Sequence, residues 1–375
     1  MSARVAVWLP DGPGAELRAA LDRLARADDV VHVAVMPDAH LAEEVCVGTV
    51  TATTRRLYPA AVGGDIGCGM VALRVEARAD LLADRDRAAR LLAALYRRVP
   101  ALVHPTAEAP PLPEDLLADP LSAPALEALK RREGRMELGT LGRGNHFLEL
   151  QRDEEGGLWI LVHSGSRAVG PAIRHHHEAL AERGASGLRS LDADSDGGRA
   201  YLADAAWAAR YAEASRARIV DAVVALLGEL FGVEADASAR IEVDHNHVRR
   251  EAHGGQPLWV HRKGAMGLAA GALGVVPGSM GSASFHVEGR GHPDALASSA
   301  HGAGRALSRA EARRRIGARQ LLREASGVWF DHRMADRLRE EAPSAYKDIG
   351  AVMRAQRDLV RVVRRLTPVL AYKAA

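Results

Sequence analysis

The chain has 375 residues, of which 47% are hydrophobic and 26% are charged, an ordinary composition for a folded, enzyme-sized protein. Its 50 basic and 48 acidic residues give a formal net charge of +2, which excludes a general nucleic-acid coat protein and makes any polyanion site a local one. There is no run of eighteen apolar residues, no signal peptide, and at most one disulfide from two cysteines. We therefore expect a cytoplasmic protein without a membrane segment.

The apolar pattern predicts both strands and helices along the chain. Short runs rich in β-branched residues predict buried strands at 30–36, 71–75, 158–162, 241–243 and 258–260. Apolar residues that recur every three or four positions predict helices at 14–27, 80–98, 203–230 and 334–366. The fold class that follows is α/β or α+β.

Two further segments are set apart by composition. Residues 100–124 are rich in proline and alanine, which break regular elements, and we expect a surface excursion and not a linker between domains. Residues 264–291 are rich in glycine, which indicates close backbone approach. The whole chain, 1–375, is predicted to be one compact domain with mixed sheets and peripheral helices around a buried metal site.

Five potential metal ligands lie next to glycines or at the ends of apolar runs. They are Asp65, Cys68, His146, His163 and His245. Strand ends beside tight turns are where site residues gather in such folds. One carboxylate, one thiolate and three imidazoles suit Mn, Fe, Co or Zn, and the ligand types do not choose among them. A single cysteine or histidine in such a position is more often a structural residue, so the prediction depends on the five together.

A second constellation surrounds His301 in the segment SSAHGAGRALSR. The amides of Gly302 and Gly304 and the side chain of Arg305 can bind phosphate oxygens, so the segment suits an imidazole that attacks phosphorus. A glycine-rich turn with a capping histidine fits the pattern equally well. The signatures of P-loop enzymes and of lysine-adenylating ligases do not occur, which argues against both mechanisms.

Other basic residues are interpreted by their neighbours. Phosphate or RNA contacts are predicted where serine or glycine flanks a cation near the candidate ligands: Arg167, Arg262, Lys263 and Arg305. The triplet at 175–177 of three histidines lies in a polar helical stretch, and we expect it on the surface and not at a metal site.

Taken together, the motifs resemble the RtcB family of RNA ligases. The resemblance runs in order through MPDAH, PAAVGGDIGCGM, LGRGNHFLEL, VHSGSRAVG, VDHNHV, VHRKGA, VPGSMGSASF, SSAHGAGRALSR and EAPSAYKDI, and so covers nearly the whole chain. It departs from the family at Ala300, where a cysteine is common, and at Ser215, where an asparagine is usual. The short chain is similar to compact bacterial members that serve RNA repair.

The resemblance implies a centre of two Mn²⁺ ions and a bound GTP. Cys68 would bridge the ions, with Asp65 and His146 completing one and His163 and His245 the other. His301 would be the nucleophile that is guanylylated, and Tyr346 would stack on guanine. The implied GTP contacts are Asn145, His146, Phe147, Leu148, Glu149, His245, Asn246, Pro277, Gly278, Ser279, Met280, Ser284, His301, Gly302, Ala303, Gly304 and Lys373.

The implied reaction joins RNA ends. A 2′,3′-cyclic phosphate is opened to a 3′-phosphate, GMP passes from His301 to that phosphate, and a 5′-hydroxyl attacks the activated end and expels GMP. Such enzymes repair broken RNA or join tRNA halves, and some need an archease-type activator. Two alternatives stay open from the residues alone: a dinuclear metallophosphoesterase that acts on cyclic phosphate ends, and a non-catalytic RNA-binding relative.

Overall fold

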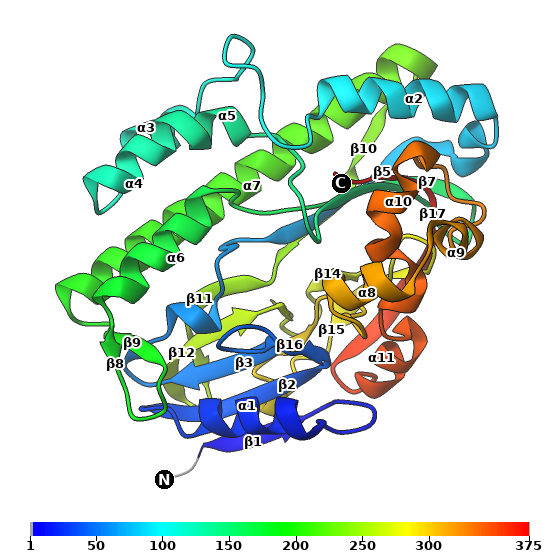
Figure 1. Ribbon diagram of the computed structural model, residues 1–375. Helices are drawn as coiled ribbons and strands as arrows, with labels where there is room; N and C mark the ends of the chain where they lie inside the picture. The colour runs from blue at the N-terminus through cyan, green and yellow to red at the C-terminus, as the bar shows by residue number, and fades with distance from the viewer. Residues whose placement is uncertain (1–2, 375) are drawn as a thin grey trace.

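Two large β-sheets form the framework of residues 3–374, the part of the chain that the computed structural model describes (Figure 1). The larger sheet has seven strands in the order β10-β5-β7-β6-β17-β15-β14, and every neighbouring pair is antiparallel. Its strands are β5 (Gly69–Arg78), β6 (Phe147–Arg152), β7 (Gly157–Ser164), β10 (Ala235–Asp244), β14 (Leu273–Val276), β15 (Ser284–Gly289) and β17 (Val360–Tyr372).

The second large sheet has five strands in the order β1-β2-β3-β12-β11, and among its pairs only β1 with β2 is parallel. Its strands are β1 (Arg4–Val7), β2 (Val30–His40), β3 (Val47–Thr53), β11 (Asn246–His253) and β12 (Gln256–Lys263). Shorter pairings within the described residues join β13 (Ala265–Gly267) to β16 (Ser298–Ala300), and β9 (Arg189–Asp192) to β4 (Arg56–Leu57) and β8 (Glu182–Arg183).

The helices lie around these sheets. Those of the described residues are α1 (Ala15–Ala25), α2 (Arg85–Arg98), α3 (Glu114–Ala118), α4 (Pro124–Leu129), α5 (Arg135–Glu137), α6 (Val169–Leu180), α7 (Asp196–Phe231), α8 (Arg309–Arg315), α9 (Ala318–Glu324), α10 (Ala335–Leu338) and α11 (Ile349–Ala355). The longest, α7, begins after Ser195, whose Oγ accepts a hydrogen bond from the Gly198 amide (3.0 Å), and ends at Gly232 with a left-handed backbone. Within residues 3–374, no helix is long and apolar enough to cross a membrane.

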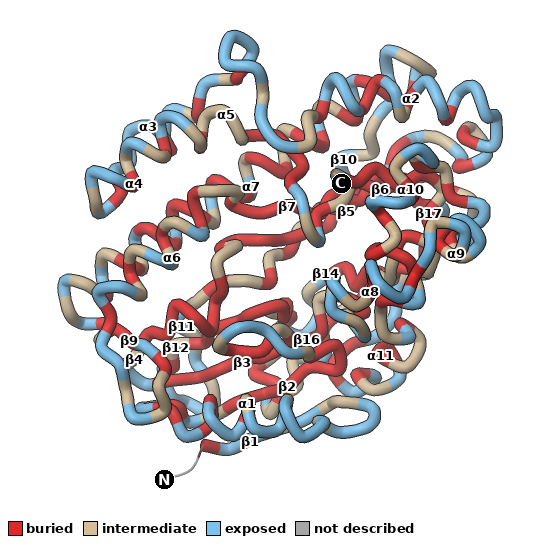
Figure 2. Tube along the Cα trace, viewed as in Figure 1, coloured by how far each residue is buried: buried red, intermediate tan, exposed pale blue. Residues whose placement is uncertain are grey.

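The main hydrophobic core lies between the seven-stranded sheet and the helices α2 and α7. Strand β7 is buried along its whole length, and Ile160 on β7 packs in one cluster with Val71 on β5 and Ile219 on α7, all three 0% exposed. Figure 2 shows this pattern, with buried residues along the central strands and exposed residues on the outer sides of the helices. Packing of this kind holds the ends of β5, β6, β7 and β10 in fixed positions.

Most of the predicted elements are confirmed. The five predicted strands lie within β2, β5, β7, β10 and β12, and the helices predicted at 14–27, 80–98 and 203–230 correspond to α1, α2 and α7. The helix predicted at 334–366 is wrong, because the segment contains the short helices α10 and α11 and then the first half of β17. Strand β17 is hydrogen-bonded on both sides, to β15 and β6, and this pairing outweighs the helix-like spacing of its apolar residues.

Two smaller expectations are corrected in part. The proline- and alanine-rich segment 100–124 is mostly exposed, but it carries a short helix, α3, and Leu112, Leu116 and Leu121 are buried in a cluster that includes residues of α6 and α7. Within the histidine triplet, His177 is only 1% exposed, and its Nε2 lies 2.7 Å from the buried carboxylate of Asp204 on α7. The surface expectation fails for His177 because one face of α6 packs against α7.

Candidate functional site

The five residues predicted as metal ligands come together at the ends of neighbouring strands. Asp65 and Cys68 lie in the turn before β5, His146 immediately precedes β6, His163 lies near the end of β7, and His245 joins β10 to β11. Because β10, β5, β7 and β6 are consecutive in the sheet, these ends lie side by side. The chain therefore gathers ligands from positions 65–245 at one edge of a single sheet.

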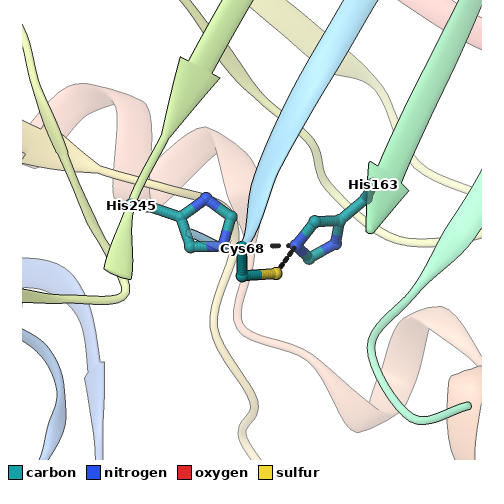
Figure 3. A group of neighbouring side chains, drawn as sticks. All are labelled: Cys68, His163 and His245. Carbon is teal, nitrogen blue, oxygen red and sulfur yellow. Dashed lines mark hydrogen bonds between the residues drawn. The ribbon is translucent and has the colours of Figure 1, made fainter. Parts of the chain in front are cut away.

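Cys68 lies between two groups of donor atoms. Its Sγ is 3.2 Å from Nε2 of His163, which in turn is 3.2 Å from Nε2 of His245 (Figure 3). On the other side, Sγ is 3.5 Å from Nε2 of His146, and that nitrogen is 2.7 Å from Oδ2 of Asp65. In each group the ligand atoms all lie within 4.8 Å of one another, and the thiol belongs to both groups.

Burial sets the protonation of these donors. It lowers the pKa of His163 and of His245 well below the ordinary value, so both imidazoles are neutral and each keeps one free lone pair. The Nδ1–H of His163 donates to the Asn145 carbonyl (3.1 Å), which leaves the Nε2 lone pair facing Cys68. Burial also raises the pKa of the Cys68 thiol, so a thiolate at this position needs a cation beside it. This donor set fits a bound transition-metal ion.

Two glycines make the close approach of these side chains possible. Gly142 has φ of +98°, and a Cβ built there would overlap Nδ1 of His146 and the guanidinium of Arg167. A Cβ at Gly165 would overlap the carboxylate of Asp65. The glycines beside the ligands therefore leave room for the ligands themselves.

A second pocket adjoins the metal-ligand group, and Asn145, His163 and His301 line both. Most residues that the resemblance assigns to GTP line this second pocket: Asn145, Phe147, Glu149, Pro277, Gly278, Ser279, Met280, His301, Gly302, Ala303, Gly304 and Lys373, together with Arg305 and Tyr346. His146, His245 and Asn246 line the metal-ligand pocket instead.

Two of the assigned residues line neither pocket. Leu148 is 0% exposed and belongs to the main core, because side chains alternate across β6 and its neighbours Phe147 and Glu149 take the pocket face. Ser284 is buried behind Glu149, and its Oγ accepts a hydrogen bond from the side chain of Gln151 (2.9 Å). Ser284 is thus placed to support the pocket through Gln151, which also donates to Glu149 (2.7 Å).

His301 lies where the two pockets meet. Its Nδ1 is 2.7 Å from Oδ2 of Asp38, and its backbone amide donates to the same oxygen (3.3 Å). Its ring centre is 4.7 Å from that of His245, so the imidazole reaches the metal-ligand group while 14% of its side chain stays exposed. Asp38, fully buried on β2, was not predicted as a site residue, although the signal was present in the MPDAH motif at the end of a predicted strand.

Charged and polar groups line the deep part of the second pocket. Nζ of Lys373 is 2.5 Å from Oε2 of Glu341, and the hydroxyl of Tyr346 donates to the same oxygen (2.6 Å). Burial raises the pKa of Glu149 to about 7, although Gln151 and Lys373 oppose the shift. Glu341 was not predicted as a site residue either, although it is the first residue of the motif EAPSAYKDI.

The predicted phosphate contacts are not equally available. Arg167 lies beside His146, with Nη1 3.4 Å from Nδ1, and Lys263 lines the metal-ligand pocket. Arg262 is 1% exposed and donates to Glu251, Ser298 and the Leu296 carbonyl, so the fold itself uses its guanidinium.

Two further arginines, Arg305 and Arg143, line the walls of the pockets. The guanidinium of Arg305 lies over the ring of Tyr346, 4.8 Å from its centre, at the wall of the second pocket. Arg143 is exposed, lines the metal-ligand pocket, and has no ion pair within residues 3–374. It was missed in the sequence, where its place between Gly142 and Gly144, two residues before Asn145, is the available signal.

Comparison with known proteins agrees with this geometry. The family model described as tRNA-splicing ligase RtcB matches residues 20–118 and 117–374. The chain belongs to the RtcB family. It is 36% identical to the RNA-splicing ligase RtcB of Escherichia coli strain K12, over 91% of this chain and 90% of that protein.

Relatives of lower sequence identity are also RtcB ligases by name and also match most of the chain. The chain is 31% identical to the RNA-splicing ligase RtcB2 of Escherichia coli strain ATCC 25922, over 94% of this chain and 90% of that protein. It is 28% identical to the tRNA-splicing ligase RtcB of Nanoarchaeum equitans, over 92% of this chain and 88% of that protein. The resemblance read from the motifs is thereby confirmed, and these three relatives align with the chain over 88% or more of their own length.

Proposed function

We propose that this chain is an RNA ligase that joins a 3′-phosphate or 2′,3′-cyclic phosphate end to a 5′-hydroxyl end with consumption of GTP, in RNA repair or tRNA splicing. The observation that carries the proposal is the position of His301, on the wall that the second pocket shares with the metal-ligand group. Membership in the RtcB family supports RNA ligation itself. The use of GTP and the chemistry of the RNA ends are what the proposal adds.

The proposed metal centre holds two manganese ions. Cys68 would lie between them, with Asp65 and His146 on one ion and His163 and His245 on the other, as the two donor groups suggest. The donor types suit several transition metals, so manganese is proposed from the family resemblance. Bound cations at this position would neutralise charge on a triphosphate and on an RNA phosphate.

His301 supplies the nucleophile in this proposal. The carboxylate of Asp38, 2.7 Å from Nδ1, favours the tautomer with its hydrogen on Nδ1, which leaves the Nε2 lone pair free to attack the α-phosphorus of GTP. A nitrogen–phosphorus bond forms as the bond to the β-phosphate oxygen breaks, so diphosphate leaves and GMP stays on His301. The RNA 3′-phosphate then takes GMP from His301, and the 5′-hydroxyl attacks that activated end and expels GMP. A cyclic phosphate end is first opened by water.

Glu149 and Lys373 are the groups that we propose to recognise guanine. The N1–H and the amino group of guanine need an acceptor, and its O6 needs a donor. Gln151 occupies Oε2 of Glu149, while Oε1 accepts no hydrogen bond from any described residue and can face a ligand. Lys373 is held at the pocket by Glu341. A base without the N1–H and amino group of guanine would leave the buried carboxylate of Glu149 without hydrogen-bond donors. That loss is unfavourable and would select against such bases.

The proposal also covers partners and location. The substrate is RNA, with Arg143, Arg167, Lys263 and Arg305 as phosphate contacts, and an archease-type activator is expected from the resemblance. We propose a cytoplasmic enzyme that resembles the compact bacterial RNA-repair members. The buried free cysteines support this location, because reducing compartments keep a ligand such as Cys68 reduced and out of disulfides.

One experiment tests the covalent step. Purified protein is incubated with α-labelled GTP and Mn²⁺ without RNA, and labelled protein is measured after denaturation. We expect an acid-labile, alkali-stable label that His301→Ala abolishes and that a remote exposed histidine, tested as His332→Ala, leaves unchanged. Absence of label, combined with opening of a 2′,3′-cyclic phosphate, would identify a metallophosphoesterase. Absence of both would point to a non-catalytic RNA-binding relative.

A further inference from the structure

The segment from Arg305 to Arg339 differs in charge from the rest of the chain. It holds ten arginines against four acidic residues, a formal net charge of +6, so the remainder of the chain sums to −4. Arginine is common throughout this sequence, but elsewhere acidic residues balance it. A local basic segment in a nearly neutral protein is the distribution expected of a local polyanion site.

Five arginines of this segment, Arg337 on α10 among them, face solvent without an ion pair among the described residues, and four of the five lie on the consecutive helices α8 and α9. These four are Arg314 and Arg315 on α8 and Arg319 and Arg323 on α9, which we call the arginine surface. The other arginines of α8 are held by the fold, since Arg309 and Arg313 both pair with Glu340. The acid closest in sequence to Arg314 and Arg315 is Glu311, whose carboxylate accepts the amide and hydroxyl of Ser308 in a capping box.

The arginine surface adjoins the site. Arg309, the first residue of α8, donates from Nη2 to Oδ1 of Asn145 (2.5 Å), and Asn145 lines both pockets. Helices α8 and α9 both pack on the turn Arg339–Glu341, which carries Glu341 to the wall of the second pocket. In Figure 1 these helices lie beside α10 and the C-terminal strand β17. A strand that leaves the site along α8 would pass Arg309 and run toward Arg314 and Arg315.

We propose that the arginine surface binds the phosphate backbone of the RNA strand whose end enters the site, an inference that rests on the proposed ligase function. Guanidinium groups present a planar set of donors that matches phosphate oxygens, and backbone contacts of this kind carry no sequence information. The four cations therefore hold the strand without restricting its sequence. They lie outside the catalytic groups, so they act on RNA binding and not on the transfer of GMP to His301.

The test removes the four charges together in the full chain, as Arg314→Ala, Arg315→Ala, Arg319→Ala and Arg323→Ala. Binding of a labelled single-stranded oligoribonucleotide with a 3′-phosphate is measured by fluorescence anisotropy between 50 and 200 mM KCl. Each phosphate contact on a single strand contributes a slope of about −0.7 to log K against log salt, so four contacts contribute about −2.8. Over this fourfold change in salt, the wild-type affinity should fall about 50-fold more than that of the variant.

A matched control removes four exposed arginines that also lack ion pairs in the described chain, Arg85, Arg87, Arg90 and Arg97 on α2, which packs mainly on α7. This control should keep the wild-type salt slope, and both variants should keep wild-type guanylylation by GTP without RNA. An unchanged slope in the α8–α9 variant, an equal change in the α2 variant, or salt-sensitive binding to phosphatidylserine vesicles in place of RNA would overturn the proposal. If the wild-type protein binds RNA with the expected salt slope but is not labelled by GTP, the RNA-binding role of the arginine surface is supported and the proposed ligase function is wrong.

Discussion

The contact between Asp38 and His301 allows a sharp test of how the proposed nucleophile is prepared. In Asp38→Asn the side chain keeps its shape but loses its charge: the amide oxygen can still accept from the backbone amide of His301, but it stabilises a hydrogen on Nδ1 less than a carboxylate does. Without the carboxylate, the tautomer with its hydrogen on Nε2 is populated more, and in that tautomer the lone pair needed for attack on phosphorus is lost. Nδ1 lies 2.7 Å from a carboxylate that is fully buried, so bulk water does not reach the position of the lost charge.

The expected magnitude follows from comparable dyads. Changing the carboxylate that orients a catalytic histidine to an amide costs about 10⁴ in rate in serine proteases, and acid–base positioning in general contributes about 10²–10⁴. We therefore expect guanylylation of Asp38→Asn to fall by about 10²–10⁴, or about 2.7–5.4 kcal/mol of activation free energy. Binding of GTP and the Mn²⁺-dependent thermal shift should change little, because Asp38 belongs to neither donor group.

The assay separates positioning from a general loss of structure. Single-turnover labelling by GTP gives the rate of the first step, and ligation of an RNA that already carries the 3′-terminal guanylyl group bypasses His301. Asp38→Asn should be slow in the first assay and close to wild type in the second. Labelling within fivefold of wild type, or an equal loss in both assays, would refute the assigned role of Asp38.

Three further predictions concern the metal, the RNA and acid stability. Cys68→Ser removes the ligand common to both donor groups, so it should abolish the Mn²⁺-dependent thermal shift and guanylylation together; retention of either would show that the thiol is dispensable. Arg143→Ala should raise KM for RNA severalfold in ligation and leave labelling by GTP unchanged, and reduced labelling would instead place Arg143 on the triphosphate. Burial lowers the pKa of His261 to about 4 in the folded protein, compared with about 6.5 in the unfolded chain. The stability that the neutral, buried His261 contributes to folding is therefore fully present above pH 6.5 and is lost as the pH falls toward 4. Between pH 7 and 5, urea unfolding should show the wild type losing about 2 kcal/mol more than His261→Gln, and an equal loss would contradict this.

The candidate ligands were accessible from sequence because each stands beside a glycine or at the end of an apolar run. When β5, β6 and β7 pair, the strand termini that carry Cys68, His146 and His163 lie at the same edge of the sheet. The local sequence pattern at each residue therefore predicts that the three side chains come together. Which strands would pair was not accessible. Strand β17 has apolar residues at helical spacing, and only its two neighbours in the sheet decide that it is extended.

Polar residues outside glycine-rich motifs were harder to assign. Asp38 contacts His301, 263 residues away in the sequence, and Glu341 contacts Lys373, 32 residues away. The residues that flank Asp38 and Glu341 in the sequence do not indicate these partners. Arg262 shows the opposite error. Its position in VHRKGA suggested a phosphate contact, but it lies in the interior beside Glu251, where an unpaired carboxylate would be costly. The sequence can therefore predict that a charged residue lies near the site, but it does not predict whether the side chain faces the site or the protein interior.

The site depends on both large sheets because of the way His245 is placed. It is the single residue between β10, at one edge of the seven-stranded sheet, and β11, at one edge of the five-stranded sheet. Cys68 and His163 come from the first sheet, and Asp38 comes from the second through β2. The distance between the metal-ligand group and the nucleophile is therefore set by how the sheets meet at His245. A metal bound by His245 would hold that junction and would thereby couple occupation of the proposed metal site to the alignment of His301.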